Sequence, residues 1–149
     1  MIVTVNIEIN KAREAVWKAI TDIDNCKKII SSIQKINILN KPASGIVGLK
    51  WEETREMFGK KATETMWITD AQTNEFYRTR AESHGAVYIT KLTLKELNGG
   101  TLLEMTFTAM PQSLFAKILS FLMAPLISKS IVKALRKDLS DIKSYVEKS

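Results

Sequence analysis

Glu53 and Arg55 are the residues whose types and spacing say most about possible chemistry. They stand two positions apart in a stretch that also contains Trp51, so in a strand all three side chains would share one face. A charge that faces a protein interior is costly unless it is paired. Two interpretations are open. Either the charges pair and orient the polar end of a ligand, or the strand ends by Trp51 and both side chains are solvated.

Acid–base or nucleophilic catalysis would need further groups. His84 is the one histidine, and a nucleophile assisted by it would need Ser83, Cys26 or a threonine beside it and a third orienting group. The sequence around His84 is instead typical of a loop tip. Glu53, Glu104 and His84 are the acid or base candidates for a cyclase or dehydratase. No residue is assigned as catalytic from the sequence.

Composition excludes several classes of function. The chain has 22 Lys+Arg and 16 Asp+Glu, a net charge of +6, but the bases are scattered and the aromatic residues are not interleaved with arginine, so no nucleic-acid partner is expected. One cysteine and one histidine cannot supply a zinc site, and no glycine-rich phosphate loop is present. No metal or cofactor is therefore expected. The single cysteine and an amino terminus unlike a signal peptide favour the cytoplasm.

The hydrophobic pattern predicts the elements that hold these residues. Residues 1–9 alternate like a half-buried strand, and residues 12–23 have the three- and four-residue spacing of a helix. A short second helix is expected around Cys26–Ser31. Period-two runs then predict six strands between residues 33 and 109, the third of the whole chain being led by Val47, Leu49 and Trp51. The last forty residues return to helical spacing, with a kink or break expected at Pro125.

This order predicts one α+β domain over residues 1–149. It would be a seven-stranded antiparallel curved sheet gripping a long carboxy-terminal helix, with two short helices after the first strand. A helix of thirty-odd residues is about 50 Å long and is the only element able to lie across such a sheet. A curved sheet cannot close tightly on it over its whole length. We therefore expect an internal cavity between the sheet and the helix.

Several short matches, in order along the whole chain, support this architecture. They are Ile9, Val16-Trp17, Ile20-Thr21-Asp22, Gly48, Gly100-Thr101 and the terminal series Leu135, Leu139, Ile142 and Glu147. Together they resemble the helix-grip (SRPBCC) superfamily of START lipid-transfer domains, birch-pollen-type allergens and polyketide cyclase/dehydrase-like proteins, and most of all the last group. The chain departs from many relatives after the Thr-Asp pair, where Cys26, Ile29 and Ile30 replace tryptophans. The resemblance implies a cavity for a hydrophobic ligand, but such a fold does not fix a function.

The expected function is therefore the binding or transport of a small hydrophobic ligand, such as a lipid, an isoprenoid or a polyketide-like compound, rather than catalysis. A cyclase or dehydratase using the same cavity, or a protein-interaction module, are the alternatives. Lys91 and Lys95 mark the outer face of their strand, so its even-numbered residues face inward. The orientation of Met66 is left open, because the strand Ala62–Thr69 has no clear alternation. The ligand-binding candidates are Trp51, Glu53, Arg55, Met66, Tyr88, Leu92, Met105, Phe107, Leu122 and Met123.

The beginning of the last helix is apolar on more than one side. Phe115, Phe121, Met123 and Ile127 exceed what one packing contact needs. Three interpretations are open: an exposed patch or homodimer contact, a portal for an apolar ligand, and a lid in transient contact with a membrane.

Overall fold

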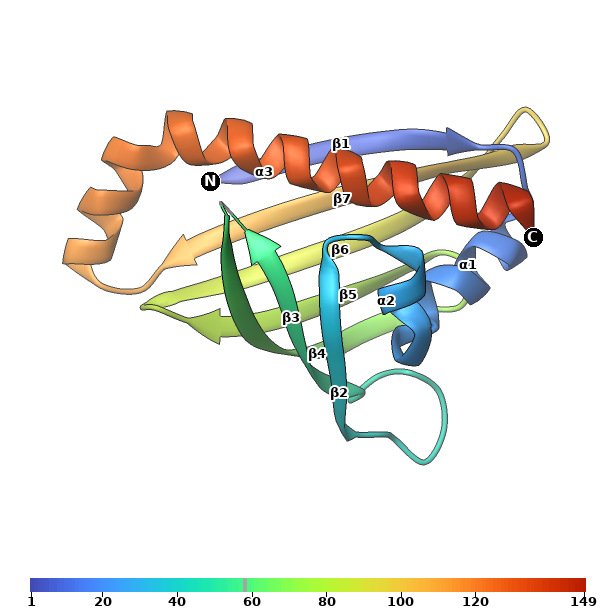
Figure 1. The fold of residues 1–149 in the computed structure, drawn as a ribbon, viewed down its shortest axis with the longest axis horizontal. Helices are drawn as coiled ribbons and strands as arrows, with labels where there is room; N and C mark the ends of the chain where they lie inside the picture. Colours follow the sequence, from blue (N-terminus) through green and yellow to red (C-terminus); the bar gives the residue numbers. More distant parts are fainter. Residues whose placement is uncertain (58) are drawn as a thin grey trace.

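The architecture comes from a computed structural model that describes residues 1–57 and 59–149. One strand and three short helices come first, six strands follow, and one long helix comes last (Figure 1). The elements are β1 (Ile2–Ile9), α1 (Arg13–Thr21), the 3-10 helix η1 (Ile23–Asn25), α2 (Cys26–Ile29), β2 (Ile33–Asn40), β3 (Lys50–Met57), β4 (Lys60–Gln72), β5 (Phe76–Ser83), β6 (Ala86–Leu97), β7 (Gly100–Pro111) and α3 (Leu114–Lys148).

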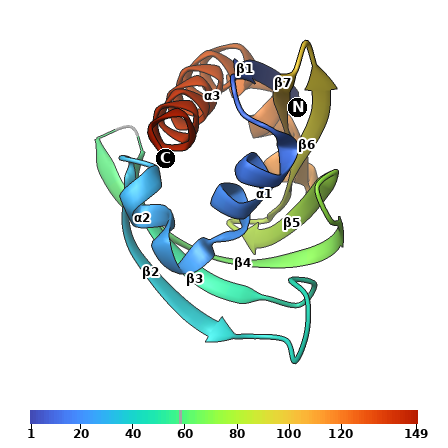
Figure 2. The same cartoon turned by 90° about the vertical axis from the view of Figure 1, so that its right-hand side faces the viewer.

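The seven strands form one antiparallel sheet in the order β1-β7-β6-β5-β4-β3-β2. Figure 2 shows that the sheet curls, with α1 and α2 on its concave side and α3 between the β1 edge and α2. The predicted α+β architecture is confirmed: a seven-stranded curved sheet, two short helices after β1 and a long terminal helix.

β1 illustrates how alternation places the core. Val3, Val5 and Ile9 are buried and Ile7 is partly buried, whereas the alternate residues Thr4, Asn6 and Glu8 are exposed. The strand pairs with β7 along its whole length, from Ile2 opposite Thr108 to Ile9 opposite Thr101. Because successive strand residues point to opposite faces, this register turns one apolar row of β1 toward the helices.

The start of β3 differs from the prediction. The strand begins at Lys50, and Val47, expected to lead it, lies half-exposed in the preceding loop. Gly45 and Gly48 there adopt φ values of +68° and +92°, which glycine tolerates and which interrupt an extended chain. The backbone N–H of Gly48 donates to the carbonyl oxygen of Ile68, so the loop is fixed against β4.

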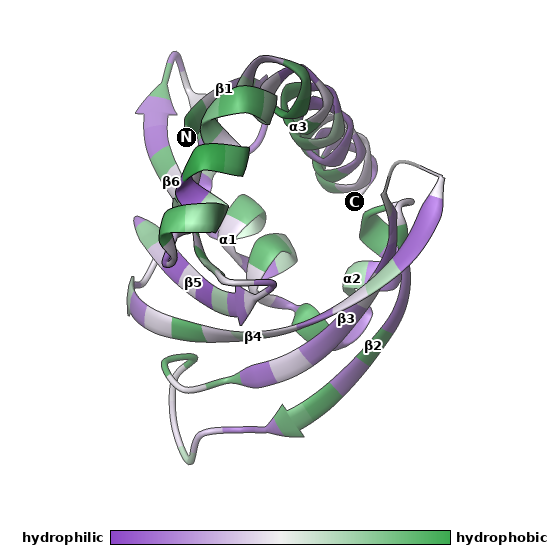
Figure 3. Ribbon diagram, turned by 90° about the vertical axis from the view of Figure 1, so that its left-hand side faces the viewer, coloured by the Kyte–Doolittle hydropathy of each residue, from purple (hydrophilic) through white to green (hydrophobic). Residues whose placement is uncertain are grey.

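α3 has two different halves. Its buried side chains all lie in the second half, from Ile131 to Val146, and this half packs on β1. The first half is apolar but largely exposed (Figure 3). Pro125 lies inside the helix, and Figure 1 shows the bend between the halves. The expected kink is found, and the helix continues through it.

Candidate ligand-binding site

The side chains of Trp51, Glu53 and Arg55 face the concave side of the sheet. β3 continues to Met57 rather than ending by Trp51, so the period-two geometry holds for all three. Trp51 is 3% exposed and Glu53 is 7% exposed. Arg55 Nε donates a hydrogen bond to Glu53 Oε2 over 2.9 Å. Of the two interpretations of this pair, the structure has the inward, paired arrangement.

Arg55 also joins the sheet to the terminal helix. Its second hydrogen bond runs from an Nη atom to Asp138 Oδ2, over 2.9 Å, and Ser32 Oγ donates to the other oxygen of Asp138 over 3.2 Å. Asp138 is buried, so one guanidinium stands between two buried carboxylates. Burial alone would lower the pKa of Arg55, but Glu53 and Asp138 outweigh it and raise that pKa. The arginine is a permanent cation held in the interior.

Cys26 and Tyr77 are the neutral neighbours of this charge cluster. Burial, and next the charge of Glu53, raise the pKa of the Cys26 thiol to about 12. Burial also raises the pKa of Tyr77, with smaller contributions from Cys26 and Glu53. The Tyr77 hydroxyl donates to the carbonyl oxygen of Ile20 over 3.0 Å. Both side chains are therefore protonated at neutral pH, and the ion-paired groups in contact here are Glu53, Arg55 and Asp138.

The indole N–H of Trp51 is buried without an acceptor. Among the residues that the structure describes, its Nε1 is the one buried side-chain nitrogen or oxygen atom with no hydrogen-bond partner. Leaving a buried donor unsatisfied costs about 1 to 3 kcal/mol. An oxygen atom of a bound molecule at this position would remove that cost.

The predicted wall residues lie on the same concave face as Trp51. Met66 pairs directly with Trp51 across β3 and β4 and packs against the core, which settles its orientation as inward. Leu92 and Met105 are buried and pair directly with each other.

Tyr88 and Phe107 form a half-buried part of this surface. Their rings stack with centroids 5.8 Å apart and planes at 21°. Ala81 stands between Met66 and Tyr88 in the register of β4, β5 and β6. A row of uncharged side chains therefore crosses the middle of the sheet from Trp51 to Tyr88.

Leu122 and Met123 lie apart from this wall. They are 68% and 40% exposed and belong to the first half of α3. The structure therefore brings eight of the ten candidates to the concave face and leaves these two at the surface. Their contact with a ligand stays a prediction.

Several polar residues in or at the edge of the interior were not among the predicted site residues; they include Cys26, Glu64, Tyr77 and Asp138. Asp138 had a usable signal, because it interrupts the apolar stripe of α3 one residue before Leu139. Glu64 stands opposite Glu53 and accepts a hydrogen bond from Ser83 Oγ over 3.0 Å. The ambiguous alternation of β4 hid its inward orientation.

The other acid–base candidates lie away from the cluster. Glu104 has the opposite parity to the buried Leu103 and Met105, and pairs with Asn6 of β1 and Thr93 of β6. His84 is exposed in the β5–β6 turn with φ of +49°. Of the three groups considered for catalysis, only Glu53 is buried at the concave face.

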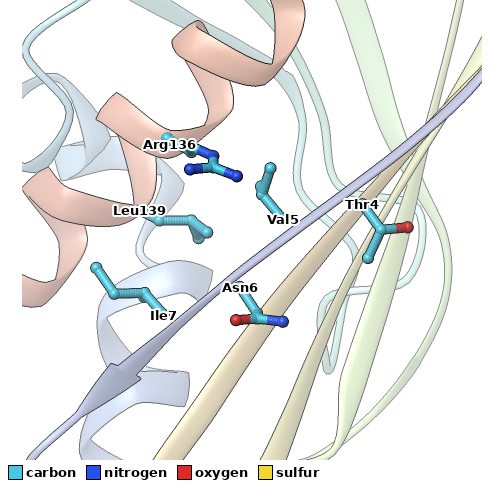
Figure 4. A pocket seen from close by; sticks show the side chains of 6 residues that line it. All are labelled: Thr4, Val5, Asn6, Ile7, Arg136 and Leu139. Carbon is cyan, nitrogen blue, oxygen red and sulfur yellow. The ribbon is translucent and has the colours of Figure 1, made fainter.

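Two surface hollows are formed by other residues. One of about 430 Å³ lies where α3 crosses the β1 edge (Figure 4) and is lined by Thr4, Val5, Asn6, Ile7, Arg136 and Leu139. Another of about 450 Å³ surrounds the β5–β6 turn and includes Arg80, His84 and Gln112. Neither hollow contains a predicted ligand-binding residue.

The state of Cys26 leads to a first prediction. A raised pKa means that the folded protein keeps the thiol proton where the unfolded chain, with a pKa near 9.0, has lost it. The stability contributed by the neutral thiol is full below pH 9 and declines as pH rises toward 12. Cys26→Ala should make the alkaline loss of unfolding free energy shallower, measured by urea denaturation at several pH values. Identical pH profiles for both proteins would contradict this.

The chain belongs to the family described as polyketide cyclase / dehydrase and lipid transport, whose sequence model matches residues 1–147. No curated protein sequence matches it significantly. Its fold is the helix-grip fold, as the sequence resemblance predicted.

Solved structures with this fold include proteins of different kinds. One is TTHA0849 from Thermus thermophilus, with 15% identity, a TM-score of 0.81 and coverage of 98% of this chain and 97% of that one. A START superfamily protein from Mycobacterium smegmatis has 14% identity and a TM-score of 0.80 over 99% and 97%. The Zhui aromatase/cyclase from a Streptomyces species has 12% identity and a TM-score of 0.76 over 99% and 93%. At these identities the similarity shows the fold.

Proposed function

We propose that residues 1–149 act as one domain that binds a small apolar molecule with an oxygen-bearing end, between the sheet and α3. The observation that carries this proposal is the unpartnered N–H of Trp51. Two residues further along β3, Glu53 begins the buried ionic cluster. The family description, which names both polyketides and lipid transport, supports the same ligand classes. A lipid, an isoprenoid or a polyketide-like compound has the required apolar body and polar end.

The two parts of the site would divide the work of recognition. Met66, Leu92, Met105 and Phe107 offer apolar surface, and burying a ligand against it is worth about 25 cal/mol per Å² before ordering costs. Trp51 would donate a hydrogen bond to the ligand oxygen. In binding sites for small apolar molecules, a small number of polar groups among apolar walls fixes the orientation of the ligand. The buried, unpaired Cys26 fits the cytoplasm, which we propose as the compartment.

Native mass spectrometry of the purified protein, followed by solvent extraction, tests the proposal directly. We expect a co-purifying apolar compound, or uptake of a fluorescent fatty acid when none is retained. Protein that carries no such compound and binds no fatty acid would contradict the proposal.

Trp51→Phe isolates the role of the indole N–H, because it keeps an aromatic ring and removes the donor. We expect the Kd for the fluorescent fatty acid to rise about fivefold, the worth of one hydrogen bond. The unliganded variant should lose little stability, because two effects oppose each other. Removal of the unsatisfied N–H stabilises the fold, and loss of part of the buried ring destabilises it. Lys91→Ala, on the other face of the sheet, is the control and should leave the Kd unchanged. Equal Kd values for both variants would exclude Trp51 as a hydrogen-bond donor to the ligand.

A cyclase or dehydratase in the same interior is the second candidate. The inward carboxylate of Glu53, held by Arg55, is the observation that favours it, because a fixed carboxylate can accept a proton from a ligand. An enzyme would convert a poly-β-keto thioester, and Glu53→Gln would stop product formation while leaving ligand binding intact. Binding of the thioester without product formation would exclude the enzyme and leave only the carrier function.

A further inference from the structure

The first half of α3 presents an unusually apolar surface to solvent. Phe121 is 83% exposed, and no residue of Leu114–Leu126 is buried. In Figure 3, which looks at the end of the molecule where α3 begins, this half is a hydrophobic ribbon that projects beside the sheet. The exposed large side chains are Leu114, Phe115, Ile118, Leu119, Phe121, Leu122, Met123 and Leu126.

The same helix face changes from apolar to basic after the bend. Residues three and four apart share one face of a helix. Along one outward face of α3 this spacing gives Phe115, Leu119, Leu122 and Leu126, followed by Lys129, Lys133 and Arg136. All seven side chains are exposed. The outward face is therefore an apolar tip continued by a row of positive charges.

The charge of this region has one sign. Between Glu104 and Asp138 the sequence contains five lysines and arginines and no aspartate or glutamate. Within the part of the chain that the structure describes, Lys129, Lys133 and Arg136 form no ion pair. The free bases next to the apolar tip call for a partner that is both apolar and anionic.

The second half of α3 shows that this helix does not cross a membrane. By length and composition α3 could cross a membrane, with a mean hydropathy of 1.6 over its most apolar 18 residues. However, its second half packs on β1 and holds Asp138 against Arg55, so crossing would require breaking the core. The bend in α3 (Figure 1) separates the apolar half from this anchored half.

We propose that the first half of α3 docks on the surface of an anionic lipid bilayer. The apolar side chains enter the boundary between headgroups and acyl chains, and Lys129, Lys133 and Arg136 lie over the headgroups. A second copy of the chain fits less well, because it could cover the apolar side chains but its matching face carries no acidic side chain for Lys129, Lys133 and Arg136. This proposal stands apart from ligand binding, since it needs no occupant of the interior.

Vesicle co-sedimentation of the whole protein tests the docking. Vesicles of phosphatidylcholine with about a third phosphatidylglycerol should bind the protein, and vesicles of phosphatidylcholine alone should bind it at least about fivefold more weakly. Raising the salt concentration should weaken binding to the anionic vesicles. Equal binding to both vesicle types, or none to either, would overturn the proposal.

Two double variants separate the apolar and basic contributions. Phe115→Ser with Leu122→Ser should weaken anionic-vesicle binding at least about tenfold, whereas Leu39→Ser with Val47→Ser, which removes two other exposed apolar side chains, should not. Lys129→Glu with Lys133→Glu should weaken it at least about tenfold, whereas Lys27→Glu with Lys28→Glu should change it less.

All eight side chains are exposed or half-exposed, so each variant should keep the circular dichroism spectrum of the parent. Sedimentation analysis without lipid distinguishes the competing occupant. A dimer that Phe115→Ser with Leu122→Ser dissociates, together with absent vesicle binding, would assign this surface to a second copy and overturn the proposal.

Discussion

Arg55→Met should lower the free energy of unfolding by about 3 to 5 kcal/mol, because it leaves two buried carboxylates without their shared cation. Glu53 and Asp138 both bind the guanidinium over 2.9 Å, one from the same strand and one from α3. Methionine replaces the volume of the arginine stem but none of its charge. Urea denaturation at neutral pH measures the loss.

A matched exchange at the surface assigns this loss to uncompensated buried charge. Arg78→Met breaks a pair with Asp70 whose side chains are 39% and 45% exposed, so it should cost less than about 1 kcal/mol. A loss at Arg55 no larger than the loss at Arg78 would contradict the uncompensated charge and indicate lost packing instead.

Gly100→Ala should be the most damaging exchange of a glycine, with a loss of about 2 to 4 kcal/mol. A Cβ atom at this position would lie 2.6 Å from the carbonyl oxygen of Ile9, a distance at which the backbone must move. The segment that would have to yield is also fixed by Thr101, whose buried hydroxyl donates to the carbonyl oxygen of Lys11 over 2.7 Å. Thermal unfolding and urea denaturation measure the change.

The neighbouring glycine is the matched control. Gly99 has φ of +81° but open space around a Cβ, so Gly99→Ala should cost only the backbone strain, about 1 kcal/mol. Equal losses at both positions would mean that the close approach to Ile9 is relieved without cost.

The fold could be predicted because alternation and helical spacing are local signals. β1 shows clean alternation, and the second half of α3 shows the 3.6-residue period, so both were found with their buried faces. The loop before β3 was misassigned because Val47 and Leu49 continue the alternation of the strand. The conformations of Gly45 and Gly48, which end the alternation, have no signal in hydrophobicity.

The site could be predicted only in part because it joins distant segments. Trp51, Glu53 and Arg55 share a face by spacing alone, so their common orientation was foreseeable. Whether the charges were buried depended on Asp138, which lies 83 residues beyond Arg55 in the chain. For Leu122 and Met123, helical spacing could not tell which part of a bent helix reaches the sheet.

The pairing of β1 with β7 has a consequence for folding during synthesis on the ribosome. β1 leaves the ribosome well before its partner and must wait for about one hundred further residues, on the order of 5 to 20 seconds at usual elongation rates. Until then β1 exposes an apolar row and an open edge, to which another nascent chain or a chaperone can bind. Slow codons, or several ribosomes close together on one messenger RNA, should therefore lower the yield of folded protein. The loss should be larger for this chain than for a protein whose strands pair only with their sequence neighbours.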